Sequence, residues 1–158
     1  MNAPRPVFAL AMAVLVVSAC APASPPPSDI AQDRAEIEAI IADYEQAINA
    51  GDLDESVAMF TPDAVFMPIG ARAQRGVEAI RAYYRDTILQ SPLQLSFTVS
   101  DIDVVGDLAW ATAVIVGTQT AADGTENPVV VNGLFVFGRN PADGSWHVVA
   151  YMFTPSVR

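Results

Sequence analysis

Apolar side chains recur with two different periods along this chain, and the change of period separates a helical first half from a strand-rich second half. From about Ile30 the apolar residues fall at Ile37, Ile41, Tyr44 and Ile48, with acidic residues between them. This spacing forms one stripe of an amphipathic helix. Gly51 is predicted to end that helix, because glycine readily adopts the left-handed conformation that closes many helices.

Two more helices and a short strand are predicted between this first helix and the strand-rich half. Asp52 and Glu55 have the spacing of a capping box, which predicts a second, short helix that runs to about Phe60. Residues 64–67 form a short apolar run and are predicted as a strand. A third helix is predicted within residues 76–92, which begin with glycine and end with proline, and its apolar positions are Ile80, Tyr83, Tyr84 and Ile88.

From Leu93 onward the period is two, which is the spacing of β-strands. The alternation slips by one position between Val99 and Ile102, and such a slip predicts a bulge and a bend. Three more strands are predicted, at Leu108 to Thr120, Pro128 to Phe137 and Trp146 to Thr154. Helices followed by a long antiparallel meander are typical of the α+β class.

The last three predicted strands are apolar on both faces. In an antiparallel sheet this pattern indicates that neither face is left to water. The helices can cover only one face, so we expect the other to pack against a second copy of the chain, as a homodimer.

An apolar run of eleven residues, Val7 to Val17, precedes Ser18, Ala19 and Cys20. The run is too short to cross a bilayer of about 30 Å. The segment resembles a lipobox, the signal of bacterial lipoproteins, which implies that residues 1–19 are removed and that Cys20 is acylated. An ordinary secretory signal with a cysteine nearby is the alternative.

Three segments are therefore expected: a signal peptide at 1–19, a proline-rich tether at 20–28 and one folded domain at 29–158. Three consecutive prolines in the tether favour an extended chain. Acylated Cys20 would anchor the domain in the bacterial cell envelope. Alanine follows the cysteine, a pattern similar to outer-membrane sorting, so we expect the domain to face the periplasm.

Composition excludes several classes of function. The net charge of −10 is unsuited to a nucleic-acid partner, because binding to phosphates depends on cationic side chains. One histidine and one cysteine, the latter committed to acylation, cannot assemble a zinc site of the usual types. Residues 101–107 imitate the start of a calcium loop, but Val105 and Thr112 stand where ligands are required. No metal and no cofactor is predicted.

Five motifs in order along the chain carry a family resemblance. They are Tyr44, Asn49-Ala50-Gly51-Asp52, Phe60-Thr61-Pro62-Asp63-Ala64, Gly70 with Arg75-Gly76-Val77-Glu78-Ala79-Ile80, and Trp146-His147-Val148-Val149-Ala150-Tyr151. Together they resemble a SnoaL-like domain of the nuclear transport factor 2-like superfamily, over about residues 29–154. The resemblance implies a cone-shaped barrel, in which a strongly curved antiparallel sheet wraps around three N-terminal helices and encloses an apolar pocket. It also implies dimers through the outer face of the sheet, but no single reaction.

Ketosteroid isomerase, a member of this superfamily, uses an aspartate base and an oxyanion site made of a tyrosine and a protonated aspartate. By this resemblance Tyr44 matches the tyrosine, the base falls on Met67 and the protonated acid falls near Gly133. Neither of the last two side chains can move a proton, so we do not expect steroid isomerisation by that mechanism.

The resemblance also places side chains in the pocket. The predicted ligand-binding residues are Tyr44, Met67, Trp110, Thr112, Phe135 and Met152. The hydroxyls of Tyr44 and Thr112 could fix a ligand carbonyl. The alternative is that the hydroxyl of Tyr44 is hydrogen-bonded to a neighbouring backbone group.

Asp143, Ser145 and His147 alternate along one predicted strand in a way that suggests a catalytic triad. Asp143-Gly144 is better explained as a turn, and a triad needs groups that converge from separate directions. His147 is expected to face the dimer side, and no catalytic residue is assigned.

The leading hypothesis is a lipid-anchored envelope protein whose pocket binds a small hydrophobic molecule without transforming it. Two alternatives remain open. One is an enzyme of isomerase, cyclase or hydrolase type that uses Tyr44 with Asp43 or Asp63 at the pocket edge. The other is a dimeric interaction module with an unused pocket.

Overall fold

The change of period at Leu93 coincides with the start of a long sheet. The computed structural model describes residues 29–156, and the predicted signal peptide and tether lie outside them. The helical elements are α1 (Ile30–Ala50), α2 (Leu53–Ala58), α3 (Val77–Asp86) and the short 3-10 helix η1 (Ile88–Gln90). The strands are β1 (Phe60–Met67), β2 (Gln74–Arg75), β3 (Leu93–Val105), β4 (Leu108–Thr120), β5 (Glu126–Arg139) and β6 (Trp146–Pro155). Within the described range, no helix has both the length and the apolar character needed to cross a bilayer.

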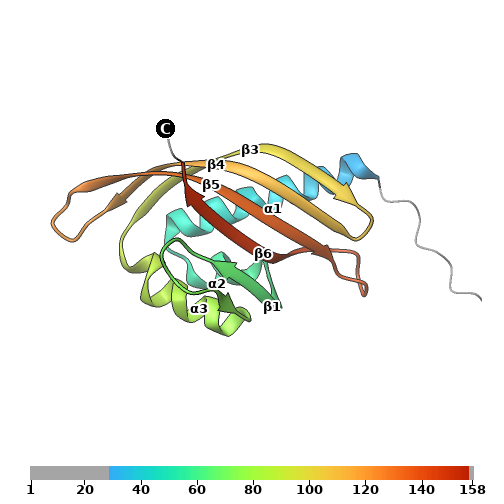
Figure 1. The fold of residues 1–158 in the computed structure, drawn as a ribbon, viewed down its shortest axis with the longest axis horizontal. Helices are drawn as coiled ribbons and strands as arrows, with labels where there is room; N and C mark the ends of the chain where they lie inside the picture. Colours follow the sequence, from blue (N-terminus) through green and yellow to red (C-terminus); the bar gives the residue numbers. More distant parts are fainter. Residues whose placement is uncertain (1–28, 157–158) are drawn as a thin grey trace, which may run out of the picture.

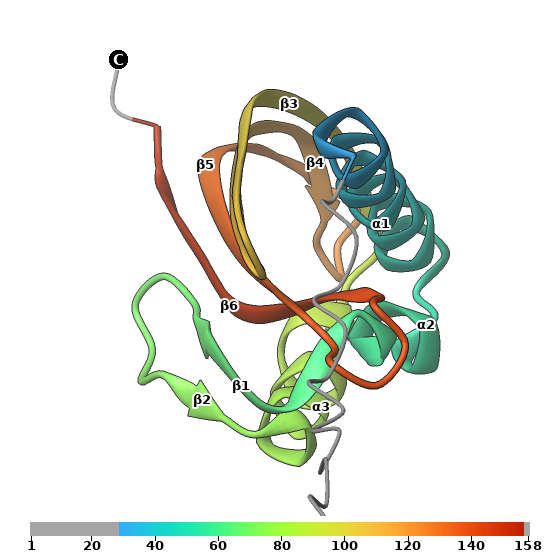
Figure 2. The same ribbon diagram turned by 90° about the vertical axis from the view of Figure 1, so that its right-hand side faces the viewer.

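The six strands form one sheet in the order β2-β1-β6-β5-β4-β3. Seen from its end, the sheet curls strongly, with α1 across its open side and α3 beside β1 and β2 (Figures 1 and 2). We call the face toward these helices the inner face and the opposite one the outer face. The α+β cone is therefore confirmed, although the sheet is not closed and β1 runs parallel to β6.

Local signals place most of the element ends correctly. Gly51 closes α1 in the left-handed conformation, with φ of 70°. Asp52 caps α2, since its side chain accepts a hydrogen bond from the backbone N–H of Glu55 at 3.1 Å. The bulge predicted by the phase slip in β3 lies where expected, between Val99 and Asp101 in the register with β4.

Strand β1 begins earlier than predicted, at Phe60 rather than at residue 64. Phe60 pairs with Val148 of β6, and the backbone N–H of Val148 donates to Met59. Pro62 has no N–H to donate, and it lies in the stretch of β1 where the pairing with β6 is interrupted. The second helix, predicted to run to about Phe60, therefore ends earlier, at Ala58, because Phe60 pairs with a strand far away in the sequence.

A second bulge, in β6, was not predicted. Phe137 of β5 pairs with Val148, whereas the neighbouring Val136 pairs with Ala150, so Val149 is the extra residue. A one-residue insertion moves every following side chain to the other face. Tyr151 and not Met152 therefore points inward.

A buried ion pair joins the start of α1 to the far end of the sheet. The guanidinium of Arg139 donates to Asp33 at 2.6 Å and stacks over the ring of Trp146 at 4.2 Å. The indole N–H of Trp146 also donates to Asp33 at 3.2 Å. Because the side chain of Asp33 is only 5% exposed, removing either charged partner would leave the other poorly solvated.

Helix α1 also completes the free edge of the sheet, because its side chains bond the backbone of edge strand β3. The side-chain amide of Asn49 donates to the carbonyl of Leu95 and accepts from its N–H, both at 2.7 Å. One turn earlier, a carboxylate oxygen of Glu45 accepts the N–H of Phe97 at 2.7 Å. We call these three bonds the α1–β3 seam. They satisfy backbone groups that an edge strand otherwise exposes.

The change Asn49→Ala is expected to lower the free energy of unfolding by about 1–3 kcal/mol, because it leaves one donor and one acceptor of Leu95 without a partner. Urea denaturation measures the loss, and faster hydrogen exchange at the Leu95 amide locates it. Gln46→Ala, at an exposed position of the same helix, is the control and should change stability by no more than about 0.5 kcal/mol. Equal effects of the two substitutions would contradict the role given to the seam.

Candidate functional site

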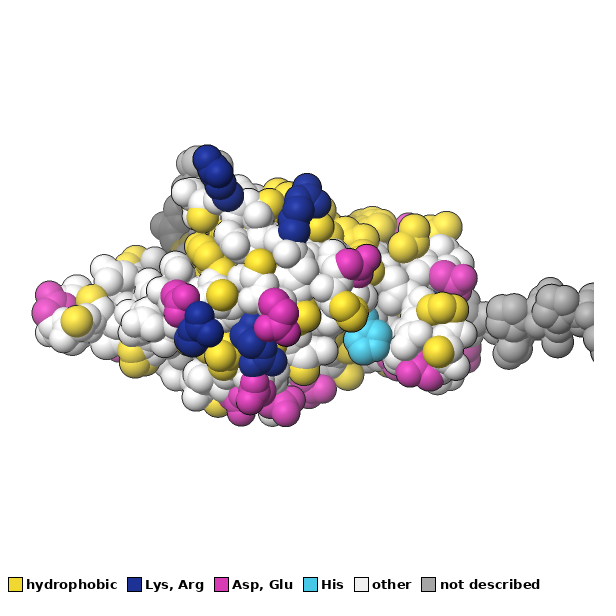
Figure 3. Space-filling view, turned by 90° about the horizontal axis from the view of Figure 1, so that it is seen from below, with side chains coloured by type: hydrophobic (Ala, Val, Ile, Leu, Met, Phe, Trp, Pro, Cys, Tyr) yellow, Lys and Arg dark blue, Asp and Glu magenta, His cyan; other side chains and the backbone are white. Residues whose placement is uncertain are grey.

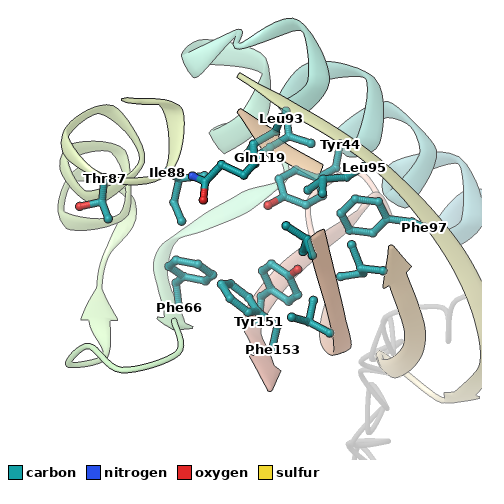
Figure 4. Close-up of a pocket in the computed structure, with 14 residues that line it drawn as sticks. Tyr44, Phe66, Thr87, Ile88, Leu93, Leu95, Phe97, Gln119, Tyr151 and Phe153 are labelled. Carbon is teal, nitrogen blue, oxygen red and sulfur yellow. The ribbon is translucent and has the colours of Figure 1, made fainter. Parts of the chain in front are cut away.

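A cavity of about 200 Å³ lies between α1, η1 and the inner face of the sheet. Aromatic rings form much of its wall, namely Tyr44, Phe66, Phe97, Tyr151 and Phe153 (Figure 4). Aliphatic side chains from α1, η1, β3, β4 and β5 complete it, and Thr87 and Gln119 add polar groups. Of the described residues that line the cavity, none carries a charge. The cavity is therefore suited to neutral, mostly apolar molecules.

Hydroxyl groups provide its main polar feature. The hydroxyls of Tyr44 and Tyr84 lie 2.7 Å apart in a hydrogen bond that joins α1 to α3. Tyr151 packs its ring edge-on to Tyr44, with ring centroids 5.9 Å apart. Burial raises the pKa of all three phenols well above the usual value, because it desolvates the charged form. They are neutral at physiological pH and act as hydrogen-bonding groups, not as bases.

The direction of the bond between Tyr44 and Tyr84 follows from the number of hydrogens available. Tyr84 is fully buried, and in the described part of the chain Tyr44 is the partner of its hydroxyl. A buried O–H without an acceptor is costly. We infer that Tyr84 donates and Tyr44 accepts, which leaves the hydrogen of Tyr44 free to be given to Tyr151 or to a bound molecule.

Aromatic rings pack around Tyr44 and fix the orientation of its side chain. Phe135 and Tyr151 lie nearly parallel, with an interplanar angle of 7° and centroids 4.1 Å apart. Tyr44 meets Phe135 and Phe97 edge-on, at 6.4 and 5.5 Å. Such contacts fix the ring orientations, so the hydroxyl of Tyr44 is held in place before any ligand arrives.

The predicted ligand-binding residues divide between the two faces of the sheet. Tyr44 lines the cavity, and Phe135 lies beneath it, fully buried against Tyr44 and Tyr151. The placement of the other four, Met67, Trp110, Thr112 and Met152, on the concave side was wrong: all four lie on the outer face.

The errors have two physical causes. In β4 both faces are apolar, so the alternation does not tell which is inside, and the residues that point inward are Ala109, Ala111, Ala113 and Ile115. Side chains converge on the concave side of a curved sheet, which leaves room for alanines there and puts Trp110 and Thr112 outside. In β6 the unpredicted bulge at Val149 turns Tyr151 to the inner face of the sheet and Met152 to the outer face.

Met67 is 37% exposed, and the neighbouring Phe66 faces the cavity in its place. The residue matched to the base therefore points away from the cavity, and a phenylalanine ring lines the cavity beside it. At the position expected for the second acid, a Cβ on Gly133 would come within 3.1 Å of Ile115 and 3.4 Å of Tyr151. A carboxylic acid would not fit there without repacking of the cavity floor.

Asp43 and Asp63, suggested as catalytic residues at the pocket edge, lie elsewhere. Both are exposed, Asp43 in a surface depression along α1 and Asp63 in a groove that it shares with His147. A histidine side chain, which can only be His147, is visible at the surface among mixed charges in Figure 3.

Asp143, Ser145 and His147 are hydrogen-bonded, but in an order unlike that of a catalytic triad. The hydroxyl of Ser145 lies between the other two, 2.6 Å from Asp143 and 3.0 Å from Nε2 of His147. The bonds from Ser145 are the main reason why the pKa of Asp143 is lowered. Because the serine donates to the carboxylate, the histidine does not activate it, and the cluster stabilises the turn before β6.

Apart from Tyr44, the residues that line the cavity were missed, Gln119 and Tyr151 among them, and so was Tyr84, the partner of Tyr44. Tyr84 and Tyr151 were recognised in the sequence only as an apolar helix position and as part of a strand motif. A signal was present, since three of the four tyrosines lie at apolar positions of the predicted helices and the fourth, Tyr151, follows three apolar residues of β6. Their meeting depends on contacts between segments 40 or more residues apart.

The curved sheet, the enclosing helices and the aromatic cavity together define a nuclear transport factor 2-like fold. A protein of that superfamily from Salmonella enterica serovar Typhimurium strain LT2 has a TM-score of 0.73 and 19% identity, over 82% of this chain and 94% of that one. A ketosteroid isomerase-like protein from Erwinia carotovora atroseptica has a TM-score of 0.72 and 25% identity, over 78% and 96%. A nuclear transport factor 2-like protein from Novosphingobium aromaticivorans, described as having a cystatin-like fold, has a TM-score of 0.62 and 23% identity, over 78% and 82%.

Within this superfamily, the sequence also matches the model of one particular family. The model of the SnoaL-like domain matches residues 40–149. The chain belongs to the SnoaL-like domain family.

Proposed function

We propose that this protein captures a small hydrophobic molecule in its cavity without transforming it. The observation that carries the proposal is a preformed apolar cavity with neutral phenol hydroxyls and, among the described residues that line it, no carboxylate, imidazole or amine. Proton transfer needs such a group within hydrogen-bond reach of the substrate. Binding needs only the apolar walls and an oriented donor.

The volume of the cavity limits the size of the ligand. An engineered protein cavity of about 150 Å³ holds one benzene molecule. A cavity of about 200 Å³ therefore has room for one ring with a short substituent.

An enzyme remains the second candidate because a structural relative is named a ketosteroid isomerase-like protein. Against it stand Met67 and Gly133 at the positions of the two acids, and the location of Asp43 and Asp63 outside the cavity. A turnover that Tyr44→Phe abolishes in a folded protein would favour the enzyme.

Acetophenone is a suitable first probe because it is a single ring with one carbonyl. Tyr44→Phe is expected to weaken its binding about three- to tenfold, the worth of one neutral hydrogen bond, while the fold is kept. Isothermal titration calorimetry measures the change. The matched control is Tyr83→Phe, which removes a hydroxyl from α3 outside the cavity lining and should leave the affinity unchanged.

Native mass spectrometry of the protein from its own host complements this titration. A bound small molecule would support capture. No bound molecule, together with no binding of acetophenone or of ethylbenzene, would contradict it and favour the interaction module.

We further propose that Cys20 is the acylated first residue of the mature protein and holds the domain in the bacterial envelope, on the periplasmic side of the outer membrane. The motif before Cys20 supports this, and the cysteine itself lies outside the described residues. Mass spectrometry of the membrane fraction tests it: an unmodified cysteine, or cleavage elsewhere, would contradict the anchor.

The outer face of the sheet is our proposed dimer interface. Its centre carries exposed apolar side chains, among them Trp110, Val114, Val116 and Val130, each 37–42% exposed. Apolar groups gathered on one face of a soluble domain are typical of protein contacts. Asp103 lies on edge strand β3 and Arg75 on the opposite edge strand β2. A twofold axis parallel to the strands would bring the acidic edge of each copy to the basic edge of the other.

Val114→Glu is expected to produce monomers, because it buries an unpaired charge at the centre of this interface. Light scattering on a soluble chain that begins after Cys20 measures the mass before and after the change. Gln46→Glu, on the exposed face of α1, adds the same charge elsewhere and should leave the dimer intact. A strictly monomeric unsubstituted protein would refute the proposal.

A further inference from the structure

Gln119 is a polar residue in a mostly apolar cavity. It lies near the end of β4 on the same face as the buried Ile115, and it pairs with Leu93 at the start of β3. Figure 4 shows its amide beside Ile88, on the side of the cavity toward η1. The residue is half-buried, and within the described part of the chain its side-chain amide makes no hydrogen bond.

An amide in such a place is suited to a ligand. Its oxygen can accept and its nitrogen can donate, and both lose part of their hydration on entering an apolar wall. A bound molecule that pairs with the amide would restore that loss. An apolar side chain of similar length would line the wall without this property.

The cavity then has two polar positions of different character. At one, the hydroxyl of Tyr44 offers a hydrogen, in keeping with the direction inferred above for its bond with Tyr84. At the other, Gln119 offers a donor and an acceptor. Aromatic side chains line the space around them (Figure 4).

The walls also restrict the charge and shape of the ligand. An ionised ligand would lose its hydration without meeting an opposite charge, since none of the described lining residues is charged. Rings that line a narrow cavity favour a flat aromatic partner through stacked and edge-on contacts.

We propose that Gln119 is a specificity-determining residue, and that the ligand is a neutral, single-ring aromatic molecule with a hydrogen-bond acceptor for Tyr44 and a second polar substituent for Gln119. This inference rests on the proposed binding function and names the chemical class of ligand. It assigns Gln119 a role in choosing among ligands of equal size.

The test compares probes that differ in one group. Ethylbenzene, acetophenone, the three positional isomers of hydroxyacetophenone, and benzoate are titrated by calorimetry into the full-length protein. Acetophenone is expected to bind more tightly than ethylbenzene and benzoate. One hydroxyacetophenone isomer is expected to bind about three- to tenfold more tightly than acetophenone, the contribution of one added neutral hydrogen bond.

Two variants assign that gain to its residue. Gln119→Leu is expected to abolish the advantage of the hydroxylated isomer while it leaves the affinity for acetophenone within about twofold. Gln94→Leu is the control, since Gln94 is exposed on the neighbouring strand and lies outside the cavity lining. It should keep the advantage.

The outcomes separate this inference from the function on which it rests. If no probe binds, the binding function fails. If acetophenone binds but no hydroxylated isomer gains, or if the gain persists in Gln119→Leu, the role of Gln119 is wrong while binding stands. Tighter binding of benzoate would overturn the requirement for a neutral ligand.

Discussion

The α1–β3 seam is the constraint on which the cavity depends. The sheet is open, and strand β3 would otherwise present unpaired backbone groups at its edge. Asn49 bonds both backbone groups of Leu95, as a neighbouring strand would, and Glu45 bonds Phe97. Leu95 and Phe97 are also cavity walls, and Tyr44 projects from the same helix. The three bonds therefore close the cone and set the distance between the helix that carries the donor and the strand that faces it.

The same seam explains why the cavity is not filled. Helix α1 is held by polar bonds along β3 near its C-terminal end, and by the pair of Asp33 and Arg139 at its first turn. With both ends fixed, the helix cannot move inward to occupy the space above Phe135 and Tyr151. Protein interiors otherwise pack nearly without voids. The hydrogen bond between Tyr44 and Tyr84 then joins α1 to α3 across the inner end of this space and orients the hydroxyl that we assign to the ligand.

Local patterns were sufficient for the elements and not for the site. Gly51, Asp52 and the phase slip after Val99 act within a few residues of themselves, and their predictions were confirmed. The inner face of β4 could not be identified from the sequence because both faces are apolar. The bulge at Val149 was not predicted because the alternation of side chains along β6 gives no sign of it. Asn49 was recognised as part of a family motif, but its partner Leu95 lies 46 residues away, and the sequence contains no trace of that contact. The size of the cavity likewise depends on packing between distant segments.

The chemistry left in the cavity favours capture over conversion. Enzymes accelerate a reaction only through interactions that are stronger in the transition state than in the bound substrate. A neutral phenol could stabilise a developing oxyanion, but in an isomerisation that charge develops as a base removes a proton, and Met67, where the base was expected, points away from the cavity while Phe66 lines it. The phenols themselves cannot serve, because burial raises their pKa values and keeps them protonated. What remains is a donor that can bind an acceptor on a ground-state ligand, which agrees with the binding function that we propose for the cavity.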